Sequence, residues 1–149
     1  MRFLKIAIVY ASVHHGNTKK IVDEIAKVQD VELVDATRVK EKDLSGYDAI
    51  GFASGIYYGK FHQAVLNFAT VNLPQDKKVF LICTHGGSVA TFQSMKTLLK
   101  GKHANLIGKF SCKGYDTYGP FRFVGGIAKG HPNEKDLAVA IDFYKGIMQ

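Results

Sequence analysis

The chain has little cysteine and no pattern of metal ligands. Its 149 residues include two cysteines, Cys83 and Cys112, and each lies within an apolar run that is typical of a strand. A metal site built on cysteine needs further Cys or His ligands at short, characteristic spacings, and neither cysteine has such spacing. We therefore expect no metal site, and we expect both thiols to act as small apolar side chains.

A membrane-spanning segment is also missing. No window reaches the roughly 18 consecutive apolar residues that a transmembrane helix requires. Residues 1–11 faintly resemble a signal peptide, but no cleavage site of small residues follows, and cleavage would remove the first expected strand. The chain has 149 residues, of which 46% are hydrophobic, and this length and composition are sufficient for one domain with a full core. We expect a single cytoplasmic domain over residues 1–149, with no membrane contact.

Three common phosphate-binding signatures are absent. A dinucleotide site requires G-x-G-x-x-G after the first strand, whereas the first loop here contains one glycine, Gly16. The nucleoside triphosphate motif G-x-x-x-x-G-K-[ST] does not occur either. A receiver domain needs a phosphorylatable Asp after the third strand, where Ala53 and Ser54 stand. The residues therefore argue against these three classes of protein.

The formal net charge is +7, but its pattern is not that of a nucleic-acid-binding protein. The lysines occur singly or in pairs, without interleaved aromatic residues or a known nucleic-acid motif. We expect no nucleic-acid partner. The charge instead favours a basic face for an acidic partner or ligand.

The chain does contain apolar runs that alternate with segments of helical periodicity. This pattern predicts an α/β protein with a parallel sheet covered by helices on both faces. The last strand partly alternates apolar and polar residues, which is typical of an edge strand. A long loop rich in glycine and aromatic residues spans residues 114–133. The expected strands are 6–10, 31–34, 49–53, 79–83 and 106–113. The expected helices are one that follows the 12–18 loop and ends near residue 28, 62–71, 92–101 and one beginning at 133, with one or two helical turns at 40–44.

The loop at residues 12–18 lies between the first strand and the first helix. The first N–H groups of a helix lack partners within the helix, and the helix dipole adds partial positive charge there. Ser12, Asn17 and Thr18 add hydroxyl and amide donors, and Gly16 lets the backbone approach a ligand closely. These residues favour a phosphate site, although an ordinary turn with an N-cap is the alternative.

Two further loops, residues 54–60 and 84–88, are expected at the same edge of the sheet. In such sheets ligands bind beyond the carboxyl ends of the strands, where the strand order reverses. Tyr57, Tyr58 and His85 offer flat faces for stacking, unless the tyrosines simply pack on the domain. The nearby glycines leave backbone amides for the polar edge of a ring. Together the loops predict a mononucleotide whose flat ring lies between them.

The sequence Gly16-Asn17-Thr18, followed by Lys20-Ile21, matches the T-G-N-T phosphate loop of the flavodoxins. The chain resembles this family of FMN-binding electron carriers over residues 5–146 in the order of its elements and in the three loops. The resemblance implies a doubly wound α/β sheet of five parallel strands in the order 2-1-3-4-5. It also implies FMN as cofactor, no catalytic side chain, and a reductase and an acceptor as redox partner proteins.

The resemblance assigns the FMN contacts to the three loops. In the family, a glycine in the first ring loop lets a peptide turn so that its carbonyl accepts from N5–H of reduced flavin, and Gly55 and Gly59 are the candidates here. The family threonine is replaced by His15, which follows His14, in a loop one residue longer. An imidazole with a pKa near 6.5 is expected to strengthen phosphate binding below pH 7. The implied contacts are Ser12, Val13, His14, His15, Gly16, Asn17 and Thr18 for the phosphate, and Ser54, Gly55, Ile56, Tyr57, Tyr58, Gly59, Lys60, Thr84, His85, Gly86 and Gly87 for the ring.

An enzyme remains the alternative to a carrier. Residues 56–62 also resemble a loop of the flavodoxin-like protoporphyrinogen oxidases, but residues 88–104 are too few for the long extra segment of those enzymes. The aromatic residues of the 114–133 loop either wall a substrate pocket or cover the end of the sheet. The alternative is therefore an FMN-dependent oxidoreductase of the protoporphyrinogen-oxidase-like or quinone-reductase-like type.

The basic charge leads to a prediction about redox potential, because familiar flavodoxins are strongly acidic. Negative surroundings disfavour the anionic, fully reduced flavin, and their loss stabilises it. One unit charge at a distance of about 10 Å contributes ~0.4 kcal/mol in water-like dielectric before screening. We expect a redox titration to show a second reduction step less negative than is usual for the family. A very low potential for that step would contradict this prediction.

Overall fold

The computed structural model describes residues 4–12, 16–86, 91–114 and 130–149. Its parallel sheet has the order β2-β1-β3-β5-β6, and the short β4 pairs with β3 outside that path. The order confirms the expected 2-1-3-4-5 arrangement, since β5 and β6 are the fourth and fifth expected strands. The strands are β1 (Ile6–Ala11), β2 (Val31–Asp35), β3 (Ala49–Tyr57), β4 (Lys60–Phe61), β5 (Lys78–His85) and β6 (Asn105–Lys113); the helices are α1 (Asn17–Val28), α2 (Gln63–Asn72), α3 (Gln93–Gly101) and α4 (Glu134–Ile147).

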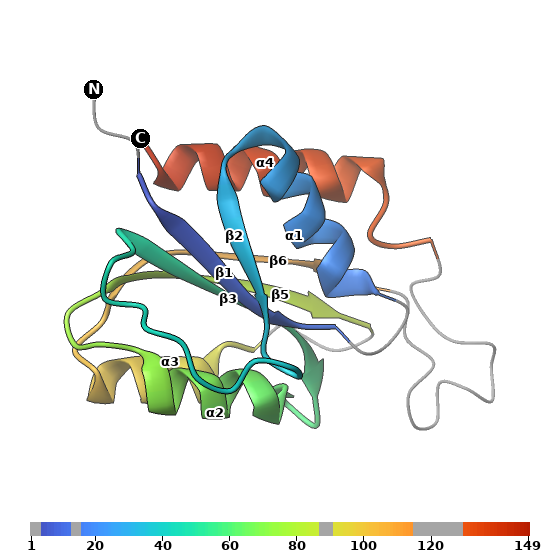
Figure 1. Cartoon of the computed structure of the whole chain (residues 1–149). Helices are drawn as coiled ribbons and strands as arrows, with labels where there is room; N and C mark the ends of the chain where they lie inside the picture. Colours follow the sequence, from blue (N-terminus) through green and yellow to red (C-terminus); the bar gives the residue numbers. More distant parts are fainter. Residues whose placement is uncertain (1–3, 13–15, 87–90, 115–129) are drawn as a thin grey trace.

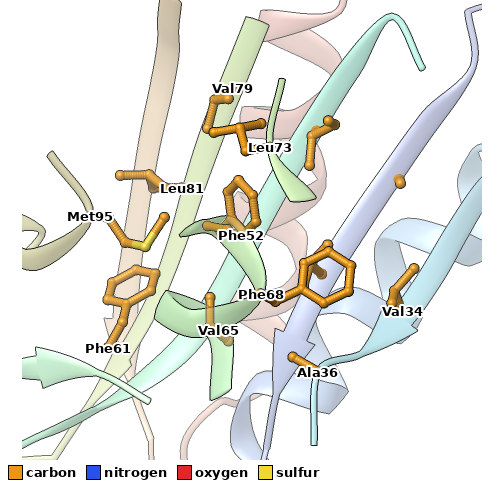
Figure 2. Packing of buried hydrophobic residues seen from close by; sticks show 14 of the residues in the cluster. Val34, Ala36, Phe52, Phe61, Val65, Phe68, Leu73, Val79, Leu81 and Met95 are labelled. Carbon is orange, nitrogen blue, oxygen red and sulfur yellow. The ribbon is translucent and has the colours of Figure 1, made fainter. Parts of the chain in front are cut away.

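The helices form a layer on each face of the sheet (Figure 1). Helices α1 and α4 cover one face, and α2 and α3 cover the other. On the α2–α3 face, Phe52 of β3 and Leu81 of β5 point toward Val65 and Phe68 of α2 and Met95 of α3 (Figure 2). Both faces of the central strands are therefore buried, which explains why those strands read as continuous apolar runs.

Two of the three predicted ligand loops begin as strands, which corrects the sequence prediction. Residues 54–57 continue β3, and Tyr57 and Ile56 pair antiparallel with Lys60 and Phe61 of β4. Residues 54–60 are therefore a β-hairpin and not an open loop. Thr84 and His85 likewise extend β5 through pairing with the end of β6. Sequence periodicity did not reveal these extensions, because the end of β3 pairs with β5 and with the adjacent β4, and the end of β5 pairs with β6.

The helical turns expected at residues 40–44 do not occur in the structure. The side chain of Asn72, at the end of α2, takes the place of helical hydrogen bonds. Its Oδ1 accepts from Lys42 N at 3.0 Å, and its Nδ2 donates to Lys40 O at 2.9 Å. Leu44 is fully buried at the end of this segment. An amide some 30 residues away therefore satisfies backbone groups that a helix would otherwise pair.

Other expectations are confirmed. Asn133 caps α4 in a reciprocal capping box with Asp136. Cys83 and Cys112 are buried in β5 and β6, and burial raises the pKa of each thiol to about 12, so both remain protonated at neutral pH. Strand β6 lies at the edge of the sheet. None of the helices in the described part of the chain has the length and apolar character that a bilayer crossing requires.

Small side chains on β3 make room for a large aromatic residue on the α1–α4 face. Gly51 pairs with Phe80 of β5, and a Cβ on Gly51 would lie 2.4 Å from Phe80 Cε2. Phe80 is fully buried and packs against Phe143 and Tyr144 of α4, with ring centroids 6.5 and 5.9 Å away. The ring therefore has little freedom to move aside.

We expect Gly51→Ala to lower the free energy of unfolding by about 2 kcal/mol, because the added methyl group overpacks a close-packed core. Urea denaturation measures this change. Gly146→Ala is the matched control, since a Cβ there meets nothing within 4 Å on the exposed side of α4. That variant is expected to gain about 0.5–1 kcal/mol from helix propensity. Equal stability of the two variants would contradict the packing argument.

Candidate functional site

The start of α1 lies at the carboxyl end of β1 and has the geometry of an anion site. Gly16 adopts a left-handed conformation with φ 65°, and its carbonyl accepts the first helical hydrogen bond from Lys20 N at 3.0 Å. The hydroxyl oxygen of Ser12 lies 3.1 Å from Lys19 N and accepts from it. An oxygen acceptor thus already sits at the first turn of α1. Val13, His14 and His15, which were predicted to contact the phosphate, lie outside the described residues.

A buried hydroxyl contact joins this helix start to the third predicted loop. Thr18 Oγ1 lies 3.1 Å from Thr84 Oγ1, and the two side chains are 2% and 3% exposed. Thr18 belongs to α1 and Thr84 to β5, so the contact fixes the helix start over the carboxyl end of β5. The structure therefore brings together two segments that the sequence analysis assigned to opposite ends of one ligand.

Gly114 completes this junction, although it was not among the predicted site residues. Its N–H donates to His85 O at 2.9 Å, which carries the β5–β6 pairing one residue past β6. A Cβ on Gly114 would lie 2.7 Å from Asn17 Nδ2, so the glycine lets Asn17 approach the end of β6. The signal in the sequence was a glycine placed directly after the last strand. Gly86 follows His85 and is half-buried, whereas Gly87 lies outside the described residues.

The side chain of Ser54, a predicted ring contact, makes its hydrogen bonds within the chain. Its side chain is fully buried in β3, where Oγ donates to Gly55 O at 2.6 Å and accepts from His62 N at 2.8 Å. Phe61 N donates to Ser94 Oγ of α3 at 3.2 Å. These hydrogen bonds anchor both strands of the hairpin to the body of the protein. Ser54 therefore positions the hairpin, and its hydroxyl is engaged within the chain.

His62 joins the hairpin to α2 and is a second residue that the predicted site lacked. Its Nδ1 accepts from Ala64 N at 3.0 Å and caps α2, and its ring meets the edge of the Tyr57 ring at a centroid distance of 5.3 Å. Burial lowers the pKa of His62, and the Lys40 ammonium lowers it further, against the opposing effect of Asp35. The neutral imidazole required for capping is therefore favoured. A polar residue immediately before a helix was the sequence signal.

The tip of the hairpin presents an aromatic side chain on a strained backbone. Tyr58 has φ 51° and Gly59 has φ 78°, which is the geometry of a two-residue turn of type I′. Such turns favour Asn or Gly at the first position, because a side chain there costs conformational energy. The Tyr58 side chain is nevertheless 85% exposed. Backbone strain under an exposed aromatic ring is typical of a binding position.

A cavity of about 570 Å³ lies beside these segments, between the ends of β5 and β6 and the start of α4. His85 and Lys113 line one part of it, and His131 and Asp136 line another. The Asp136 carboxylate lies 2.7 Å from His131 Nδ1 and accepts from Asn133 N at 2.8 Å. Within the described residues no group of His, Cys, Asp or Glu side chains is arranged to hold a metal ion.

The chain is similar in sequence and in fold to flavodoxin-like proteins. A family model described as a flavodoxin domain matches residues 7–118. An uncharacterized protein of Methanocaldococcus jannaschii is 39% identical in an alignment of 149 positions that covers 98% of this chain and 99% of that protein. A flavodoxin from the domain Archaea has a TM-score of 0.65 at 20% identity, covering 97% of this chain and 99% of that chain. A flavoprotein of Lactobacillus acidophilus, solved in complex with FMN, has a TM-score of 0.57 at 18% identity, covering 72% and 93%.

The strained turn generates a stability prediction that is independent of any ligand. We expect Tyr58→Asn to raise the free energy of unfolding by about 1 kcal/mol, because Asn tolerates positive φ at the first position of a type I′ turn. Tyr58→Phe is the matched control and is expected to be neutral, since it keeps the same backbone strain. Thermal unfolding of the ligand-free protein measures both. If the Asn variant is no more stable than the Phe variant, the turn is not strained by its side chain.

Proposed function

Since the chain belongs to the flavodoxin domain family, we propose that it binds FMN at the carboxyl edge of the sheet and carries electrons between other redox proteins. The observation that carries this proposal is the buried contact between Thr18 and Thr84. It holds the start of α1, which suits a phosphate, against the end of β5, which suits a ring. The FMN complex of the Lactobacillus acidophilus flavoprotein supports the choice of ligand, because that protein shares the fold.

The residues present at the start of α1 fit a phosphate group. The first-turn amides of α1 and the Ser12 hydroxyl would hold it, with Gly16 leaving the approach clear of a Cβ. Asn17 and Thr18 are 8% and 2% exposed, so these two residues lie buried beneath the phosphate loop. The helix dipole adds favourable electrostatic energy for a dianion at this end of the helix.

The hairpin and the end of β5 would hold the ring. Tyr58 at the exposed tip and Tyr57, which His62 orients, are the aromatic faces on one side, and His85 lies on the other. Bound FMN supplies reversible electron storage that the protein's own side chains lack. The protein's contribution is to bind the ring, limit its contact with water and present its edge to partners.

Of the two candidate glycines for a turning peptide, the geometry favours Gly59. Gly55 pairs with Thr84 in the sheet, and its carbonyl already accepts from the Ser54 hydroxyl. Gly59 is exposed at the tip, and a Cβ there would meet nothing within 4 Å. A peptide next to Gly59 can therefore reorient at low cost and offer its carbonyl to a protonated ring nitrogen.

An FMN-dependent oxidoreductase is the second candidate, and the cavity beside His85 favours it. This cavity is large enough for a small organic substrate. The Asp136 carboxylate beside Nδ1 orients the His131 ring, which is a suitable arrangement for passing a proton to a bound substrate. Steady-state turnover with NAD(P)H and a quinone or a porphyrinogen would select this candidate over the carrier.

The proposal is tested by titrating the ligand-free protein with FMN and with riboflavin, which lacks the phosphate. We expect FMN to bind one to one with quenching of its fluorescence, and at least about 100-fold tighter than riboflavin, equivalent to ~2.7 kcal/mol from the phosphate. Tyr58→Asn is expected to weaken both flavins about tenfold through lost stacking, whereas Tyr58→Phe retains both affinities. Equal affinities for FMN and riboflavin, or no binding of either, would contradict the proposed site.

A further inference from the structure

The positive charge of the chain is concentrated in one continuous stretch of sequence. Residues 77–114 contain seven lysines and not one Asp or Glu, whereas the other 111 residues carry thirteen basic and thirteen acidic side chains. The whole formal charge of +7 therefore belongs to this stretch. It comprises β5, α3 and β6, which form one side of the protein up to the open edge of the sheet.

Two of the seven lysines, Lys77 and Lys102, donate hydrogen bonds to backbone carbonyls of other segments. Lys77 Nζ donates to Tyr47 O at 2.6 Å, and Lys102 Nζ donates to Thr70 O at 2.9 Å, so both connect segments of the backbone. The remaining five are exposed. Among the described residues the ion pairs of this protein all lie elsewhere, on α1, on β2 and its neighbouring loops, and at the start of α4. The exposed lysines are Lys78, Lys96, Lys100, Lys109 and Lys113.

Lys96 and Lys109 are held close together despite their equal charges. Lys109 lies on the edge strand β6, and its Nζ sits 5.6 Å from the ring centroid of Phe92, just before α3. Lys96 lies one turn into α3, close enough to lower the pKa of Lys109. With no carboxylate in either segment, this repulsion is not compensated within the stretch. Such a pair is a ready site for negative charge from outside the chain.

This basic region reaches the proposed FMN site. Lys109, Ser111 and Lys113 alternate along the same side of β6, and Lys113 pairs with His85 at the carboxyl end of β5. The three lysines Lys96, Lys109 and Lys113 are here called the lysine edge. A protein bound to the lysine edge would lie next to the segment that is proposed to hold the ring.

We propose that the lysine edge is the docking surface for an acidic redox-partner protein, an inference that rests on the proposed electron-transfer function. Charge complementarity of this kind steers encounters and fixes orientation, which suits brief electron-transfer complexes with small interfaces. Nucleic acid is disfavoured as occupant. The stretch has no arginine, and its described part has no exposed large aromatic side chain for base stacking.

The test uses the 149-residue chain and an acidic [2Fe–2S] ferredoxin as the probe. Both proteins stay oxidised, so that calorimetry at low ionic strength reads docking and not electron transfer. We expect Lys96→Glu/Lys109→Glu to weaken ferredoxin binding at least about tenfold, with a shallower dependence on salt. The matched control Lys27→Glu/Lys145→Glu makes the same change in net charge on the α1–α4 layer and is expected to weaken binding less than about threefold.

Lysine methylation with and without the ferredoxin maps the contact directly. Lys96, Lys109 and Lys113 are expected to be protected in the complex, and Lys27 and Lys145 to remain reactive. The proposal is overturned if both double variants lose the same affinity, if the ferredoxin binds no tighter than a basic cytochrome, or if duplex DNA protects the lysine edge and the ferredoxin does not. If FMN fails to bind while ferredoxin still protects these lysines, the result contradicts the proposed FMN-dependent function but supports the lysine edge as a docking surface.

Discussion

The reversal of strand order between β1 and β3 determines where the loops at the carboxyl edge of the sheet converge. The chain leaves β1 toward α1 on one face of the sheet and leaves β3 toward α2 on the other. Connections that diverge in this way leave a space beyond the carboxyl ends of the strands. The start of α1, the hairpin tip and the end of β5 border that space. The Thr18–Thr84 contact holds two of these borders together.

The elements around this space are fixed by packing and hydrogen bonds below it. Small residues along β3 admit Phe80, which seats α4, and the buried Ser54 hydroxyl secures the hairpin to the rest of the sheet. The strained and exposed residues, Tyr58 and Gly59, lie at the tip, outside this fixed framework. A packed framework that carries an exposed turn suits a flat cofactor whose polar groups change on reduction.

Most of the fold could be predicted from the sequence because its signals are local. Apolar runs located the five strands of the main sheet, and the Asn133–Asp136 pair located the start of α4. The failures arose where pairing partners, and not local periodicity, decide the structure. Asn72 replaces a helix at residues 40–44, and pairing with β5 and β4 turns a predicted loop into a hairpin. Thr18 and Thr84 were both named from sequence, but a contact across 66 positions leaves no local signal.

In the proposed complex with FMN, a phosphate dianion lies at the start of α1. Phosphorus NMR of the protein saturated with FMN tests this most directly, because the phosphate of free FMN gains a proton near pH 6 and its resonance then shifts. A phosphate held by helix amides and the Ser12 hydroxyl is stabilised as the dianion. We therefore expect the bound resonance to stay constant between about pH 5 and pH 8. If the bound resonance shifts with pH as that of free FMN does, the phosphate lies in solvent and not at the start of α1.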